Sequence, residues 1–138
     1  MFQIQDLNHV NIVVEDLDVC RHFYCDILGM EEVRRNPDFT FPGGWFRANS
    51  AEIHVIRSDI ATHAPGDESY QVADTTEKEL SLSRHFSLVI DDTEQLVKQL
   101  EKQQVPIVYG PVERPGGLTQ TYCYDPDGHL IEFSQFKE

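Results

Sequence analysis

The chain has 138 residues, and its 24 acidic and 11 basic side chains give a formal net charge of −13. This length indicates one ordinary domain, residues 1–138. The negative charge argues against nucleic-acid and membrane partners, whose phosphates it would repel. The chain has no transmembrane-length apolar stretch and no basic N-terminal flank, so no signal peptide is expected. Its three cysteines are odd in number and form no Cys-x-x-Cys pair, which favours a reduced, cytoplasmic protein.

The first part of the chain, residues 5–57, has the pattern of one βαβββ repeat. Its expected elements are a strand at 7–14, a helix at 17–28, and strands at 31–35, 45–48 and 52–57. Asp16 is placed to cap the helix and Gly29 to end it. The helix stripe expected to be buried consists of Val19, Phe23, Ile27 and Leu28.

Residues 58–83 are polar, acidic and irregular, which predicts a linker with one helical turn at most and a candidate lid. The second repeat, residues 84–136, is expected to have the same order of elements. They are a strand at 84–90, a helix at 94–104 capped by Thr93, a short strand at 106–109, a loop at 110–117, and a hairpin of 118–124 with 130–135. The Asp-Pro-Asp-Gly sequence at 125–128 predicts the hairpin turn.

The two halves of the chain resemble each other at the positions of four polar residues. The strand beginning at His9 matches the strand beginning at His85, and Ile53-His54-Val55 matches Ile131-Glu132-Phe133. Such self-similarity indicates one supersecondary unit used twice. Two copies related by a pseudo-twofold axis would bring these strand positions together. Three imidazoles and one carboxylate would then form a site for a divalent metal.

Strand alternation places the same four side chains on one kind of face. In each strand the more apolar face is expected to lie under the helix, so His9, His54, His85 and Glu132 point to the other, concave side of the sheet. Taken singly, a histidine of this kind is more often a hydrogen-bonded strand residue than a ligand, and a glutamate such as Glu132 is more often a solvated residue. The joint pattern favours the metal site.

The expected chemistry is the chelation of a small molecule through two adjacent oxygens. Four protein ligands leave one or two coordination positions open, and the ion would act there as a Lewis acid. The donor set suits Zn, Mn, Fe, Co or Ni without selecting among them. Glu132, the only carboxylate among the ligands, is the expected base. Glu52 shares the face of His54 and is the runner-up, although it could also be an outer-rim acid.

Further residues are candidates for the walls of a substrate pocket. Arg47 could pair with a substrate carboxylate or could lie on the surface. The other candidates are Asn11 and Ser87, which flank the repeat histidines, and the aromatic residues Trp45, Tyr122 and Tyr124. The remaining histidines, His22, His63 and His129, are expected to be solvated.

These residues and their surroundings resemble the vicinal oxygen chelate superfamily, a group that includes glyoxalase I, extradiol dioxygenases and bleomycin-binding proteins. The motifs are Phe23-Tyr24 followed by Leu28-Gly29 and the ending Asp-Pro-Asp-Gly-His-Leu-Ile-Glu at 125–132. The resemblance implies an α+β fold of two βαβββ repeats in a cupped, partly closed mixed sheet. It also implies a homodimer, and metal ligands at His9, His54, His85 and Glu132.

The sequence is compatible with three functions. The first is a metal-dependent lyase or isomerase of glyoxalase type. The second is an Fe(II) dioxygenase of extradiol type, with His9, His85 and Glu132 as its two-histidine-one-carboxylate set. The third is a metal-free protein that binds an antibiotic or another ligand, a function that does not need four ligands.

Overall fold

The computed structural model describes residues 1, 3–58 and 84–137. The chain divides into two compact units, residues 1–59 and 60–138. The expected linker with its candidate lid lies outside the described residues apart from Ser58, as does His63. Within the described ranges, no helix is long and apolar enough to cross a membrane.

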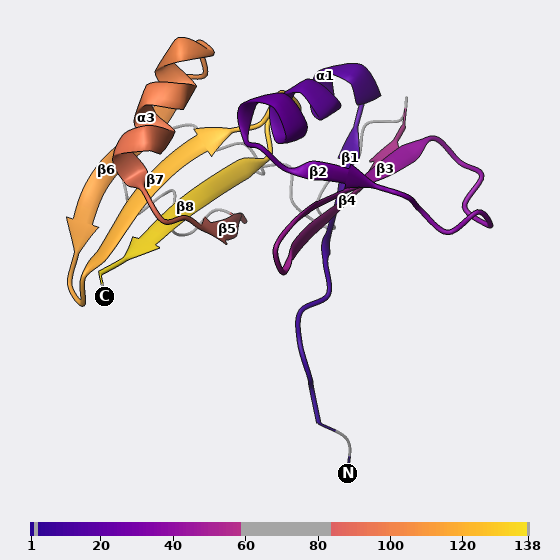
Figure 1. The fold of residues 1–138 in the computed structure, drawn as a ribbon, viewed down its shortest axis with the longest axis horizontal. Helices are drawn as coiled ribbons and strands as arrows, with labels where there is room; N and C mark the ends of the chain where they lie inside the picture. The colour runs from indigo at the N-terminus through magenta and orange to yellow at the C-terminus, as the bar shows by residue number, and fades with distance from the viewer. Residues whose placement is uncertain (2, 59–83, 138) are drawn as a thin grey trace. The chain divides into compact units, whose positions relative to one another are not determined.

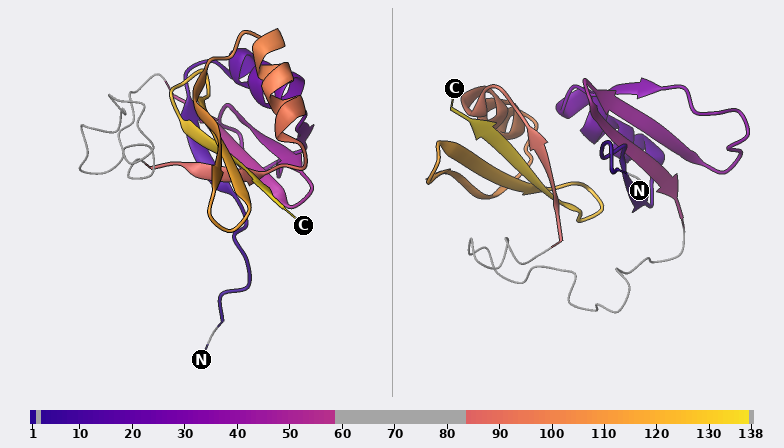
Figure 2. Two further views of the ribbon diagram at one scale, coloured as in Figure 1. Left: turned by 90° about the vertical axis from the view of Figure 1, so that its left-hand side faces the viewer. Right: turned by 90° about the horizontal axis from the view of Figure 1, so that it is seen from below.

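Unit 1 is a four-stranded mixed sheet with one helical segment on one face (Figures 1 and 2). Its elements are β1 (Val10–Val14), α1 (Leu17–Arg21), η1 (His22–Ile27), β2 (Glu31–Val33), β3 (Gly43–Ala48) and β4 (Ala51–Arg57). The strand order is β1-β4-β3-β2, with β1 parallel to β4 and the other pairs antiparallel. The helical segment packs on the sheet through Tyr24, whose ring stacks on Phe46 of β3 at 5.9 Å between centroids.

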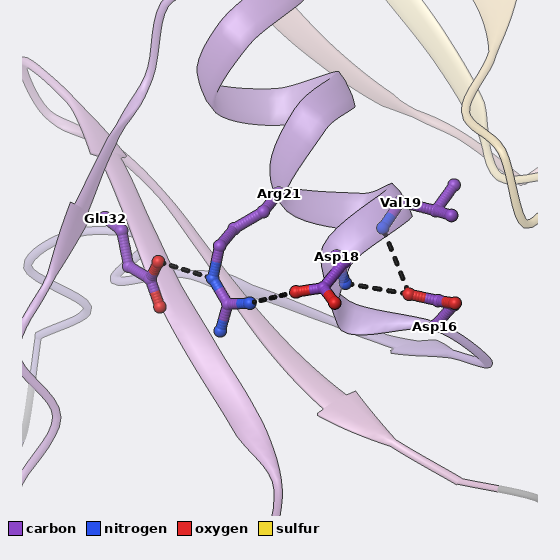
Figure 3. A network of polar contacts seen from close by, with 5 residues as sticks. All are labelled: Asp16, Asp18, Val19, Arg21 and Glu32. Atoms are coloured by element: carbon purple, nitrogen blue, oxygen red, sulfur yellow. Dashed lines mark hydrogen bonds and ion pairs between the residues drawn. The ribbon is translucent and has the colours of Figure 1, made fainter.

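The helical segment begins at the residue that the sequence predicts. The Asp16 carboxylate accepts hydrogen bonds from the backbone N–H groups of Asp18 and Val19, at 2.8 and 3.1 Å (Figure 3). These bonds satisfy two of the donors that a helix leaves unpaired at its start. Arg21 Nε then donates to Glu32 of β2 over 2.6 Å and ties the helix to the sheet (Figure 3).

The helix itself differs from the prediction in two respects. It is not one α-helix over 17–28, because it changes to a π-helical turn at His22. Val19, expected in the buried stripe, is 48% exposed. The buried residues are Cys20, Phe23, Tyr24 and Ile27. Phe23, Tyr24 and Ile27 follow Cys20 by three, four and seven residues, which is the spacing of one face of a helix. Val19 lies outside this buried face.

Unit 2 has the same topology. Its elements are β5 (Phe86–Val89), α3 (Thr93–Lys102), β6 (Ile107–Arg114), β7 (Leu118–Tyr124) and β8 (Leu130–Phe136). The strand order is β5-β8-β7-β6, with β5 parallel to β8 and the others antiparallel. The predicted α+β class with two βαβββ repeats is confirmed. The structure shows two four-stranded mixed sheets that are not closed.

Two local predictions in unit 2 are wrong. Asp92, not Thr93, caps α3, since its carboxylate accepts from the Gln95 backbone N–H at 3.0 Å. The expected loop at 110–117 is largely strand, because β6 continues to Arg114 with shifts in its register to β7. Gly110 and Pro111 indicated a loop in the sequence. Proline is tolerated here because β6 is an edge strand, where its missing N–H need not join the ladder.

Candidate metal centre

In each unit, three candidate residues lie directly opposite one another on three neighbouring strands, and together they form a row across the sheet. The central residue of each row, His54 or Glu132, lies on the last strand of its unit and has a strand neighbour on both sides. The row in unit 1 is Asn11, His54 and Trp45, on β1, β4 and β3, and the row in unit 2 is Ser87, Glu132 and Tyr122, on β5, β8 and β7. The repeat seen in the sequence is therefore also a repeat of strand register.

The two remaining predicted ligands lie just before the first strand of each unit. His9 precedes β1 and His85 precedes β5, although the sequence had placed both inside longer strands. In unit 1 the rings of His9 and His54 stack, with centroids 3.7 Å apart and planes at 15°. In unit 2 His85 Nε2 lies 3.2 Å from Glu132 Oε2. Each unit thus brings together its own pair of predicted ligands.

The chemistry of these pairs fits a divalent ion. Unit 1 offers two imidazoles, and unit 2 offers an imidazole and a carboxylate, which are donors used for Zn²⁺ and related ions. Within the described ranges, no group of three or more His, Cys, Asp or Glu side chains gathers at one point. An imidazole nitrogen binds metal in the plane of its ring. The stacked His9 and His54 would therefore bind one ion together only after one ring turned. His9 is exposed, and its Nδ1 lies 2.6 Å from Asn8 Oδ1.

His54 is fixed by contacts on three sides. Its ring lies between His9 and Trp45, and the Trp45 ring is nearly parallel to it, at 4.2 Å and 4°. Glu52 Oε1 lies 2.8 Å from His54 Nε2, and Glu52 Oε2 pairs with Arg47 at 3.0 Å. The hydrogen bond with His54 lowers the pKa of Glu52 below its ordinary value, helped by Arg47 and opposed by partial burial. Glu52 is thus a paired carboxylate at the site.

Glu132 is a buried carboxylate with 7% of its surface exposed. Its Oε1 accepts hydrogen bonds from Gln120 Nε2 at 2.6 Å and from Ser134 Oγ at 3.0 Å. Ser134 Oγ also lies 2.7 Å from Ser87 Oγ. Gln120 was missed in the sequence, although strand alternation places it two residues from Tyr122 and opposite Ser134 in the register.

Two of the three aromatic candidates, Trp45 and Tyr122, lie in these rows. Tyr122 is buried, meets the His85 ring edge to face at 5.7 Å, and packs with Leu130 and the half-buried Tyr124. Trp45 meets Phe39 at 5.8 Å between ring centroids. Trp45 therefore places an aromatic face against His54, and Tyr122 places an aromatic ring beside His85.

The two other described histidines differ from each other. His22 is exposed, as expected, and pairs with Asp26 at 2.9 Å. His129 is not solvated, which corrects the prediction. It is half-buried, and its Nδ1 lies 2.7 Å from the buried Asp125. Asp125 also accepts from the backbone N–H groups of Asp127 and His129, so this network holds the hairpin turn between β7 and β8.

Two βαβββ units of the same topology are the architecture of the vicinal oxygen chelate class of proteins. The chain belongs to the Glyoxalase/Bleomycin resistance protein/Dioxygenase superfamily, whose profile matches residues 6–133.

Curated relatives and solved structures agree with this membership. The chain is 29% identical over 136 residues to the "Probable lactoylglutathione lyase" of Synechocystis sp., covering 94% of each chain. It is 28% identical over 134 residues to the metallothiol transferase FosB of Staphylococcus epidermidis, covering 94% of this chain and 81% of that protein. Its fold matches the fosfomycin resistance protein FosX of Listeria monocytogenes with a TM-score of 0.68 at 18% identity, covering 98% and 96% of the two chains.

Proposed function

We propose that the chain is a divalent-metal-dependent enzyme, a lyase or isomerase of glyoxalase type that acts on a small molecule through two adjacent oxygens. One observation carries this proposal. Each unit brings together the two ligand-type side chains that the repeat singles out, His9 with His54 and His85 with Glu132. The similarity to proteins named lactoylglutathione lyase and metallothiol transferase supports an enzyme that works through a metal.

The proposed ligands are the three histidines of these pairs, through neutral ring nitrogens, and the carboxylate of Glu132. A bound divalent ion supplies Lewis-acid polarisation of a substrate oxygen. The donor set accepts Zn, Mn, Fe, Co or Ni. Glu132 is the proposed base, and it would take up or return a proton at Oε2, the oxygen that faces His85, when the carboxylate shifts off the metal. Glu52 remains the runner-up base, although its bonds to His54 and Arg47 suit an orienting role better.

The proposed pocket is built around the same rows. Asn11 and Ser87 are exposed next to His54 and Glu132. Asn11 can donate a hydrogen bond to a substrate oxygen. Ser87 can accept one from a substrate hydroxyl, because its own proton goes to Ser134. Arg47 is half-exposed, and we propose that it also binds a substrate carboxylate from its position beside Glu52. The rings of Trp45, Tyr122 and Tyr124 would form the apolar walls.

Metal analysis of protein purified without chelator tests the proposal. We expect about one divalent ion per chain in the wild type and a large loss in His54→Ala and Glu132→Ala. His22→Ala is the matched control, because His22 is an exposed helix residue that pairs with Asp26, four residues along the same helical segment. It should keep its metal. A wild type that binds no divalent ion would contradict the proposal and favour a metal-free ligand-binding protein. Bound Fe(II) with substrate-dependent oxygen consumption would instead indicate the dioxygenase, with His9, His85 and Glu132 as ligands.

A further inference from the structure

We propose that Gln120 and Ser134 are positioning residues, which hold one carboxylate oxygen of Glu132 so that the other, Oε2, is the oxygen offered to the metal. This inference rests on the proposed function, because it takes Glu132 as a ligand. It adds two residues and assigns different tasks to the two oxygens of the carboxylate.

The hydrogen bonds around Glu132 separate its two oxygens. Oε1 accepts from Gln120 Nε2 at 2.6 Å and from Ser134 Oγ at 3.0 Å. A carboxylate oxygen has about two lone-pair positions, so these two donors occupy Oε1. Oε2 lies on the side of His85, whose Nε2 is 3.2 Å away. Of the two oxygens of Glu132, Oε2 is therefore the one that faces His85, the other predicted ligand of unit 2.

The direction of each hydrogen bond that leads to Glu132 is fixed by the chemistry of its donor. A serine hydroxyl has one proton, and Ser134 donates it to Glu132, so the 2.7 Å contact between the two serines requires Ser87 to donate to Ser134. Gln120 can only donate to a carboxylate, through its amide nitrogen. The hydrogen bonds thus run from Ser87 to Ser134 and from Ser134 to Glu132. They cannot run in the opposite direction, because an ionised carboxylate has no proton to donate.

The backbone makes this arrangement rigid. Gln120 and Ser134 are directly opposite each other on the neighbouring strands β7 and β8, and Ser134 is two residues from Glu132 on the same face. Ser134 is 4% exposed and Glu132 is 7% exposed. A buried carboxylate must be hydrogen-bonded, and donors on paired strands hold its orientation more precisely than donors on loops would.

Two variants test the assignment. Gln120→Met keeps the length of the side chain and removes its donor, and Ser134→Ala removes the hydroxyl. We expect each to weaken Co²⁺ binding about 10-fold to 100-fold in calorimetry, as is typical for the loss of a bond that orients a ligand. The absorption spectrum of the Co²⁺ protein should also change, because a carboxylate free to rotate can coordinate through both oxygens. Ser134→Thr keeps a hydroxyl and should restore both measurements.

Thr121→Val is the matched control. Thr121 lies next to Gln120 on β7 but on the opposite face, and its buried hydroxyl has no hydrogen-bond partner among the described residues. This variant should bind Co²⁺ with the wild-type affinity and spectrum. If Gln120→Met and Ser134→Ala also did so, Gln120 and Ser134 would have only a structural role and the inference would be wrong. If the wild type itself bound no divalent ion, the proposed function would fail first and the inference with it.

Discussion

The indole of Trp45 lies flat against the imidazole of His54, with ring centroids 4.2 Å apart and planes at 4°. The two residues are directly opposite each other on the antiparallel strands β3 and β4. Trp45 is also the only tryptophan in the chain. Its fluorescence therefore reports on the immediate surroundings of one predicted metal ligand.

We expect Co²⁺ or Ni²⁺ to quench the fluorescence of Trp45 in a saturable way. Both ions have open d shells and would be held on the ring that contacts the indole. Titration of the wild type should reach its plateau at the concentration that calorimetry gives for binding. His54→Ala should lose the saturable quenching, whereas His22→Ala should keep it. Saturable calorimetric binding with unchanged fluorescence would remove His54 from the ligand set.

Glu132→Gln should lower both metal affinity and turnover. Glutamine retains one oxygen ligand but loses the negative charge and the base. Metal affinity should fall about 10-fold or more, and turnover should fall further, since general base help is worth about 10²–10⁴-fold. Glu52→Gln should change metal content little, because its oxygen can still accept from His54. The reverse result, with turnover kept in Glu132→Gln and abolished in Glu52→Gln, would make Glu52 the base.

His129 should stabilise the protein in a pH-dependent way. Burial lowers the pKa of His129, but the hydrogen bond to Asp125 and the charges of Asp125 and Asp127 outweigh it and raise the pKa above the ordinary value. A raised pKa stabilises the folded state at pH values below about 6.5, the pKa of an unperturbed histidine, and this contribution is lost as the pH rises through the folded-state pKa. The stability difference between wild type and His129→Gln should therefore be largest at acidic pH and shrink with increasing pH. Urea unfolding from pH 5.5 to 9 measures it, and a difference that grew with pH would contradict the network.

Asp16→Ala should destabilise unit 1. The substitution removes the cap of α1 and leaves the N–H groups of Asp18 and Val19 without their acceptor (Figure 3). Loss of such a cap costs about 1 kcal/mol of the free energy of unfolding. Asp18→Ala is the control, because it leaves the Asp16 cap in place and removes an exposed ion pair with Arg21, which is worth less and weakens in salt. Equal losses in the two variants, measured by urea unfolding, would argue against the cap.

We also expect a homodimer, as the family resemblance implies. Each sheet ends in edge strands, β1 and β2 in unit 1 and β5 and β6 in unit 2, and edges of this kind are usually covered. Val89 and Phe136 are apolar side chains that are 73% and 56% exposed. Light scattering should give twice the chain mass of 15.9 kDa at high micromolar concentration. A monomer at that concentration would rule out the dimer.

Much of the fold could be predicted because it is local in the sequence. The alternation of Ile53 and Val55 with polar residues indicated the strand β4 and its buried face, and Asp16 marked the start of the helix. The boundaries were less accurate. The sequence predicted that the strand at 106–109 ends before Gly110 and Pro111, whereas β6 continues to Arg114. Whether a proline interrupts a strand depends on the position of that strand in the sheet, and a local sequence pattern does not contain this information.

The sequence by itself determined the repeat, and with it the equivalence of His9 with His85 and of His54 with Glu132, because self-similarity at a fixed spacing is visible along the chain alone. Only the tertiary structure decided what surrounds these residues. Gln120 is 12 residues from Glu132 and Ser87 is 47 residues from Ser134, yet both contacts are hydrogen bonds. Strand order and register bring such residues together, and these are set by the burial of apolar faces across the whole sheet, which a local pattern does not encode.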